Sequence, residues 1–107
     1  MTDTLAAELE RYRADRRISA ALLVSEDGFL VAASAAPGVD IEALAAQIAP
    51  VVISVRRLSG EIEGGATRLI SIELAHSTVL MAPFENEVLL ALVGEPGALT
   101  LTESARA

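Results

Sequence analysis

Apolar residues recur at steps of three and four along the stretch from Asp40 to Gly65, DIEALAAQIAPVVISVRRLSGEIEGG. This spacing places them in one stripe along an α-helix, so we predict a long helix whose stripe packs on a core. Asp40 suits the N-cap, and Gly64 or Gly65 suits the left-handed position that ends a helix. The residues of the stripe are Ile41, Leu44, Ala45, Ile48, Val51, Val52, Val55, Leu58 and Ile62.

The side of this helix away from the stripe is unusual, because no residue between Ala43 and Val55 is charged. A helix at the surface of a monomer is normally polar on that side. We therefore expect the helix to pack on its own sheet with one face and to meet another protein with the other. The alternative is a helix covered on both sides within its own domain. The small or apolar residues of this second side are Ala46, Ala49, Pro50 and Ile53.

Before the long helix, the pattern predicts a short helix and a hairpin. Residues 3–17 place apolar side chains at helical spacing. Two apolar runs follow at 18–25 and 29–35, and Asp27-Gly28 between them favours a tight hairpin turn. The first run is almost continuously apolar, which is typical of a strand covered on both faces.

After the long helix, the pattern predicts three more strands, at 66–75, 78–84 and 87–93. The last of these is continuously apolar and should be central, whereas the first contains polar and charged residues and should be an edge. Pro83 should lie at the end of its strand or at a bulge. Residues 96–107 predict a weakly structured tail.

Length and composition favour one domain, residues 1–107, with a core of Ala, Val, Leu and Ile. The net charge of −7 argues against binding to nucleic acid or to an anionic membrane, because both require clustered cations. The absence of cysteine excludes disulfides and thiolate metal sites. No apolar run reaches transmembrane length and no signal-peptide core is present, so we expect a cytoplasmic protein that does not insert into membranes.

Candidate catalytic chemistry is sparse. His76 is the only histidine, and a lone histidine at a strand end is more often a turn residue than a base or a metal ligand. Ser25, Glu26 and Asp27 are close in sequence, but a hairpin turn accounts for them. The glycines at 60–65 close a helix instead of opening one, so they form no phosphate-binding loop. We expect no enzyme activity, no bound cofactor and no metal.

Arg56 and Arg57 follow the uncharged part of the long helix. Two explanations are open for this pair. The two arginines can favour the helix C-terminus and form salt bridges there, or they can contact a partner protein.

The order of helix, hairpin, long helix and three-strand meander resembles that of the Roadblock/dynein light-chain family. The hairpin sequence VSEDGFLVA at residues 24–32 supports this resemblance, which covers roughly residues 2–95. The bacterial members encoded beside Ras-like GTPases are the most similar.

The resemblance implies an α+β domain of profilin-like architecture, with a five-stranded antiparallel sheet in the order 2-1-5-4-3. A long helix should cover one face of this sheet and shorter helices the other. The family forms homodimers that join their third strands edge to edge with the long helices side by side, and it binds a small GTPase near those helices. It implies no bound nucleotide and no catalytic residue. The interface candidates carried over are Ala46, Ala49, Ile53, Arg56 and Arg57 in the helix, and Leu69, Ser71 and Glu73 in the third strand.

We therefore expect a homodimeric regulatory scaffold that binds a Ras-like small GTPase and modulates its GTP hydrolysis or its localisation, two outcomes that the sequence does not separate. The alternative is a PAS-like or profilin-like sensor domain that holds a small apolar ligand between helix and sheet. An enclosed cavity of roughly several hundred Å³ would favour the sensor, and an exposed apolar helix surface would favour the scaffold.

Overall fold

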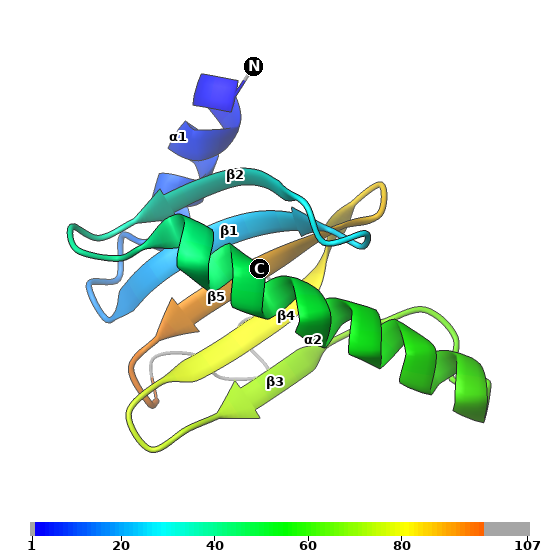
Figure 1. The fold of residues 1–107 in the computed structure, drawn as a ribbon. Helices are drawn as coiled ribbons and strands as arrows, with labels where there is room; N and C mark the ends of the chain where they lie inside the picture. Colours follow the sequence, from blue (N-terminus) through cyan, green and yellow to red (C-terminus); the bar gives the residue numbers. More distant parts are fainter. Residues whose placement is uncertain (1, 98–107) are drawn as a thin grey trace.

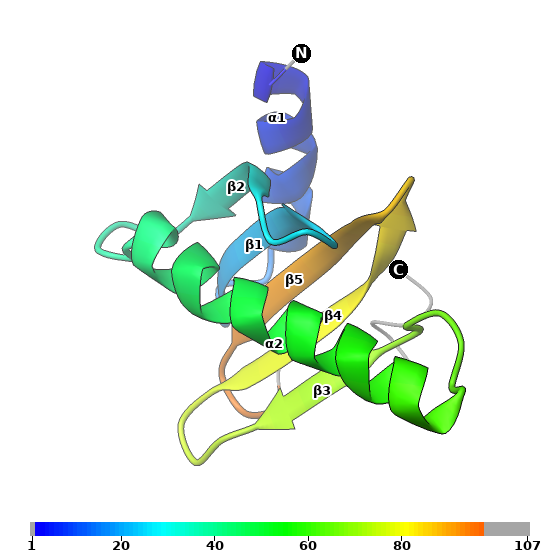
Figure 2. The same cartoon turned by 45° about the vertical axis from the view of Figure 1, so that its right-hand side comes forward.

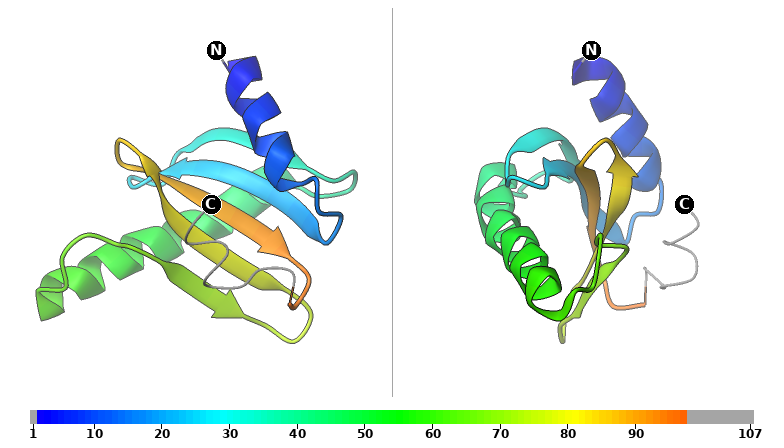
Figure 3. Two further views of the ribbon diagram at one scale, coloured as in Figure 1. Left: turned by 180° about the vertical axis from the view of Figure 1, so that it is seen from behind. Right: turned by 90° about the vertical axis from the view of Figure 1, so that its right-hand side faces the viewer.

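The computed structural model describes residues 2–97, with side chains from Leu5 onward. The strands form one five-stranded antiparallel sheet in the order β2-β1-β5-β4-β3. Helix α2 crosses one face of the sheet and α1 lies against the other (Figure 1, Figure 3). The elements are α1 (Thr2–Tyr12), β1 (Ile18–Ser25), β2 (Leu30–Ala35), α2 (Ile41–Ile62), β3 (Ile70–Glu73), β4 (Thr78–Glu85) and β5 (Val88–Gly94).

This architecture confirms the predicted α+β fold and the predicted strand order. One detail differs within residues 2–97, because α1 is the single helix opposite α2 where several shorter helices were expected. Most of the predicted tail, residues 98–107, lies outside the described residues.

The two central strands are β1 and β5, as their continuous apolar sequences predict. Side chains alternate between the two faces of a strand, so a central strand covered on both sides is apolar throughout. In β1, every residue from Ala20 to Val24 is at most 2% exposed. This strand therefore contributes to the core on both faces of the sheet.

The core has two layers. Under α2, Ile48 and Val52 pack with Met81 and the α2-facing residues of β1 and β5. Under α1, the fully buried Leu9 packs with Leu23 and its neighbours on the opposite face. Each helix is thus held by burial of apolar side chains on its own face of the sheet.

The later strands differ from the prediction at their ends. β3 is confined to Ile70–Glu73, because the preceding residues form the connection that returns from the end of α2 to the sheet. Asn86 and Glu87, with φ of 39° and 61°, form the β4–β5 turn one residue later than predicted. Pro83 borders a shift in register in β4, which confirms its predicted place at a bulge.

Helix α2 begins as predicted, but its left-handed end lies one residue earlier than predicted. The Asp40 carboxylate accepts a hydrogen bond from the Ala43 N–H at 3.1 Å and caps the first turn. The helix continues through Pro50. Glu63, not Gly64, takes the left-handed conformation at the end, with φ of 53°, and the Gly64 N–H donates to the Ser59 carbonyl.

The length of α2 exceeds the width of the sheet. Its 22 residues span about 33 Å, whereas five strands span roughly 24 Å. Figure 2 shows the last turns of α2 extending past β3, beyond the edge of the sheet. These turns have no strand beneath them.

The β1–β2 hairpin turn lies on the middle of α2. Ser25 N–H donates to the Phe29 carbonyl at 2.8 Å, and Gly28 has a φ of 95°, so the predicted Asp27-Gly28 turn is confirmed. A Cβ atom at Gly28 would lie 3.0 Å from the Ala49 Cβ. Glycine is therefore required here by both the backbone angle and the close approach of the helix.

Replacing Gly28 by Ala should destabilise the fold more than the same change at Gly38. Both glycines have positive φ, but nothing lies within 4 Å of a Cβ at Gly38. We expect a loss of about 1 kcal/mol for Gly38→Ala from the backbone angle alone. For Gly28→Ala we expect about 2 kcal/mol, because Ala49 must also shift. Urea denaturation of the two variants measures this difference, and equal losses would show that the contact with Ala49 contributes nothing.

Candidate functional site

The second half of α2 presents apolar side chains to solvent. Leu58 is 58% exposed and Ile62 is 66% exposed, while Val55 is half-buried. The sequence pattern placed all three in the stripe that faces the core, and for Leu58 and Ile62 that prediction is wrong. The reason is the overhang of α2, since the stripe continues past the last strand (Figure 2).

Two hollows lie along this part of the helix, and the second also reaches the segment that leads into β3. One has a volume of about 310 Å³, opens to solvent and is lined by Pro50, Val51, Ser54, Val55 and Leu58. The second, of about 200 Å³, has Val55, Leu58, Ile62 and Leu69 among its lining residues. We call Val51, Val55, Leu58, Ile62 and Leu69 together the distal apolar surface. A contiguous exposed apolar surface of this kind is typical of a protein interface.

The edge strand β3 lies beside the distal apolar surface. The Leu74 N–H donates to the Ser77 carbonyl at 2.8 Å, so Leu74 and Ser77 form a hydrogen-bonded pair that continues the β3–β4 register. Hydrogen-bonding groups alternate between partner strand and outside along an antiparallel strand. The N–H and C=O groups of Ser71 and Glu73 therefore point away from β4 and are available to another strand.

The structure separates the predicted interface residues into two groups. Leu69, Ser71 and Glu73 lie at the β3 edge, as the resemblance implied for the third strand. The five helix residues are nearer the β1–β2 hairpin, which approaches α2 at Ala49 and Ile53. Successive residues of a helix are about 100° apart, so Arg56 and Leu58 point in nearly opposite directions. Exposure along the helix also varies, since Ala46 and Arg57 are exposed and Ala49 and Ile53 are half-buried.

Arg56 contacts the hairpin turn of its own chain. Its Nη1 lies 3.3 Å from the Glu26 carbonyl oxygen and 3.5 Å from the Asp27 Oδ1. Arg57 makes no ion pair within residues 2–97 and is exposed. Of the two explanations open for the arginine pair, the salt-bridge explanation applies to Arg56, although its partner is the hairpin and not the helix end.

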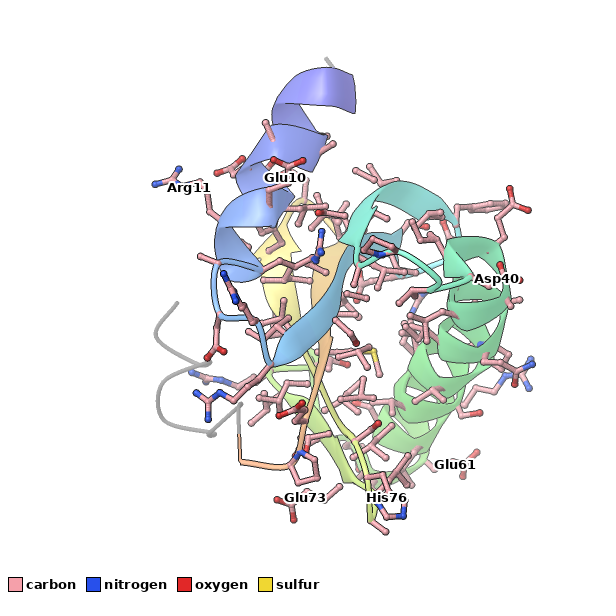
Figure 4. The ribbon with its side chains drawn as sticks, turned by 90° about the vertical axis from the view of Figure 1, so that its left-hand side faces the viewer. Glu10, Arg11, Asp40, Glu61, Glu73 and His76 are labelled. Atoms are coloured by element: carbon pink, nitrogen blue, oxygen red, sulfur yellow. The ribbon has the colours of Figure 1, made fainter. Side chains whose placement is uncertain are left out.

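Ionic interactions are few in the described part of the chain. Arg17 pairs with Asp15 at 2.8 Å, and the hydrogen bonds from Arg17 lower the pKa of the Asp15 carboxyl. Within residues 2–97, no three His, Asp or Glu side chains gather as metal ligands. Figure 4 shows His76 at the exposed turn between β3 and β4, far from Glu10 and Arg11 on α1. The described residues thus present apolar contact surface and open strand edges.

The sequence analysis missed Leu58 and Ile62 as surface residues. Periodicity identifies which residues share one side of a helix but not where the opposing sheet ends. A usable signal was the length of the stripe, since a helix of 22 residues is longer than a sheet of five strands is wide. Within residues 2–97, no helix is long and apolar enough to cross a membrane.

Comparison with protein families identifies one match, the family described as the Roadblock/LC7 domain, over residues 5–94. Comparison with curated proteins gives no match. Several solved structures share the fold, including two MglB proteins and a Roadblock/LC7 domain. MglB from Myxococcus xanthus has a TM-score of 0.79 at 19% identity, and the match covers 97% of this chain and 83% of that one.

The gliding protein MglB from Thermus thermophilus has a TM-score of 0.75 at 18% identity, over 92% of this chain and 76% of that one. A Roadblock/LC7 domain from Streptomyces avermitilis has a TM-score of 0.60 at 21% identity, over 76% of this chain and 68% of that one. At these identities the likeness establishes a shared fold.

Replacing Arg56 by Gln should loosen the hairpin turn, whereas Arg57→Gln should not. An exposed pair contributes little to global stability, so both variants should unfold within about 1 kcal/mol of the unmodified protein. The difference should appear locally, as faster amide hydrogen exchange at Gly28 and Phe29 in Arg56→Gln alone. Unchanged exchange at these amides would show that Arg56 does not hold the turn.

Proposed function

Because the chain belongs to the Roadblock/LC7 domain family, we propose that it is a homodimeric regulatory protein that binds a Ras-like small GTPase. The observation that supports the dimer is the distal apolar surface beside the open edge of β3. Burial of Leu58 and Ile62 removes apolar area from water, and pairing of two β3 strands satisfies their free N–H and C=O groups. A single dimer interface would provide both stabilising effects.

The β3 edge is suited to pairing with its own copy. A twofold contact places the same surface on both protomers. If Ser71 pairs with the Ser71 of the second copy, Glu73 lies opposite Leu69 and not opposite a second Glu73. The arrangement thus avoids like charges facing each other, which destabilise a strand pair.

Charge restricts where two copies can meet, since each has a net charge of −7. The five residues of the distal apolar surface are uncharged, so contact there adds little repulsion. This dimer differs from the one expected from sequence, which buried Ala46, Ala49 and Ile53. Because the hairpin already approaches Ala49 and Ile53, the distal apolar surface is the better candidate.

The GTPase is proposed from the family resemblance and from the free side of α2. If the distal apolar surface is used for dimerisation, the side with Ala46, Ile53 and Arg57 remains open in each protomer. Arg57 is an exposed cation that forms no ion pair within residues 2–97 of an acidic protein, and such a group can orient an acidic partner surface. The chain contains no lysine, and the described loop that leads from a strand into a helix, residues 36–40, has one glycine and ends in the acidic N-cap Asp40, unlike a glycine-rich phosphate-binding loop. We therefore assign nucleotide binding to the partner.

The alternative of a small-ligand sensor has less support. The space between α2 and the sheet is filled by side chains such as Ile48, Val52 and Met81, each at most 5% exposed. The hollow lined by Pro50, Val51, Ser54, Val55 and Leu58 lies outside that layer and opens to solvent.

Replacing Leu58 by Glu should convert the dimer to a monomer. The new carboxylates would face an acidic second copy in an apolar contact, where like charges cost several kcal/mol. Light scattering should give twice the protomer mass of 11.1 kDa for the unmodified protein and 11.1 kDa for Leu58→Glu. Ala46→Glu is the matched control, since Ala46 is exposed on the same helix outside the distal apolar surface. Dissociation by Ala46→Glu alone would place the dimer contact on the other side of α2.

Replacing Arg57 by Glu should weaken binding to a purified GTP-loaded Ras-like GTPase from the same organism by about tenfold and reduce its salt dependence. Arg16→Glu is the control, because Arg16 is an exposed arginine beyond α1, away from α2. Calorimetry at two salt concentrations measures both effects, and single-turnover assays show whether binding accelerates GTP hydrolysis. No binding by the unmodified dimer to the GTP-loaded or GDP-loaded form would contradict the proposed partner.

A further inference from the structure

The second edge of the sheet is β2, whose face toward α1 is covered but whose strand contains no charged residue or proline that would protect its free backbone groups. Its sequence LVAASA contains no charge and no proline. Phe29 just before it is 70% exposed, Leu30 is 39% exposed and Val31 is 41% exposed. Proteins usually protect an edge strand with lysine, proline or charge, because its free backbone groups can pair with another chain. The proposed dimer uses β3 and leaves β2 open.

The backbone of β2 presents hydrogen-bonding groups to solvent in a regular pattern. The Ala36 N–H donates to the Ser19 carbonyl at 2.8 Å, and the β1–β2 register continues from there without a shift through Ala33. Because groups alternate along an antiparallel ladder, the N–H and C=O groups of Ala33 and Ala35 point away from β1. An added strand would pair with these groups.

A bulge limits the length of this open ladder. The register shifts where Leu30 and Ala32 pair with consecutive residues of β1, so Val31 is the extra residue. The regular edge therefore runs from Ala32 to Ala35, with the exposed apolar residues at its beginning. This length matches a short extended segment of about four to six residues.

Charge at the two ends of β2 defines the segment that would fit. Glu26 and Asp27 lie in the turn before the strand, and Asp40 and Glu42 lie where α2 begins, after it. Figure 4 shows Asp40 at the start of α2. Within residues 2–97, Asp27 pairs with Arg56, and the other three acids form no ion pair. The residues of the edge are uncharged, Arg13 on the α1 side donates a hydrogen bond to Ser34 in its middle at 2.9 Å, and acids outnumber cations at both ends. Its complement is a segment with basic ends and an uncharged, apolar middle.

The position of α1 favours a single segment over a second copy of this chain. Figure 1 and Figure 3 show α1 on one face of the sheet, with its N-terminal part projecting past β2. Antiparallel pairing of two identical β2 edges would place both α1 helices on the same face, over the same junction. A lone extended segment brings no helix and can lie along β2 beside α1.

We propose that the edge of β2 binds an extended segment of another protein by strand addition, with apolar residues in the middle of the segment and basic residues at both ends. This interaction is separate from the dimer contact at β3 and from the GTPase surface on α2.

A labelled synthetic peptide, Arg-Val-Thr-Val-Thr-Val-Arg, tests the proposal with the full chain. Fluorescence anisotropy should show saturable binding, and the same peptide with glutamate ends should bind about tenfold more weakly at low salt, with a smaller difference at high salt. In the bound state, the amides of Ala33 and Ala35 should exchange hydrogen more slowly. Protection at Ser71 and Glu73 instead would place the peptide at the β3 edge and overturn the proposal.

Two variants separate backbone pairing from surface charge. Ala35→Pro removes an outward N–H without removing a donor to β1, so it should weaken peptide binding by about tenfold. Val31→Lys places a charge at the edge and should weaken binding similarly, while Leu74→Lys adds the same charge to an exposed apolar residue far from β2 and should not. If Ala35→Pro does not fold, Val31→Lys and Leu74→Lys still decide the question.

Three results would refute this assignment. The first is no binding of the arginine-ended peptide at micromolar to millimolar concentrations. The second is equal binding by Val31→Lys and Leu74→Lys. The third is a solution mass above that of the dimer that falls only in Val31→Lys, which would assign the β2 edge to a second copy of this chain.

Discussion

The mismatch between the length of α2 and the width of the sheet determines where this protein has a core and where it has a surface. Roughly a quarter of the helix extends beyond the strands. Over the sheet, the apolar stripe buries Ile48 and Val52, and past the sheet the same stripe exposes Leu58 and Ile62. One periodic sequence thus has two physical roles, and the boundary between them is the last strand.

The fold could be predicted from sequence to the extent that it depends on local pattern. The continuous apolar runs of β1 and β5 require burial on both faces, and Asp27-Gly28 requires a turn, so the central strands and the hairpin follow directly. The strand order came from the family resemblance, since local pattern does not specify which strands are neighbours. The ends of β3 and α2 were less well predicted. Glu63 takes the left-handed position although two glycines follow it, which propensity alone does not indicate.

The candidate site was predicted less completely than the fold. The strand residues Ser71 and Glu73 were placed at an edge because of their polarity, and the structure places them there. On the helix, absence of charge drew attention to Ala49 and Ile53, whose neighbour is the hairpin of the same chain. The sequence pattern shows that an apolar helix face should be buried, but it does not distinguish burial by another segment of the same chain from burial by a partner protein. That distinction depends on contacts between segments that are distant in sequence.

The close approach of Gly28 to α2 has a consequence for residue 49. A side chain larger than alanine at this position would clash with the hairpin turn and push it away from the helix, because the two are already in close contact here. Asp27 would move away from Arg56, and the exposed Phe29 and the start of β2 would move with it. Residue 49 therefore acts as a spacer that sets the position of the β2 edge relative to α2. The relative position of the two surfaces for which we propose different partners would thus depend on the size of one side chain, the methyl group of Ala49.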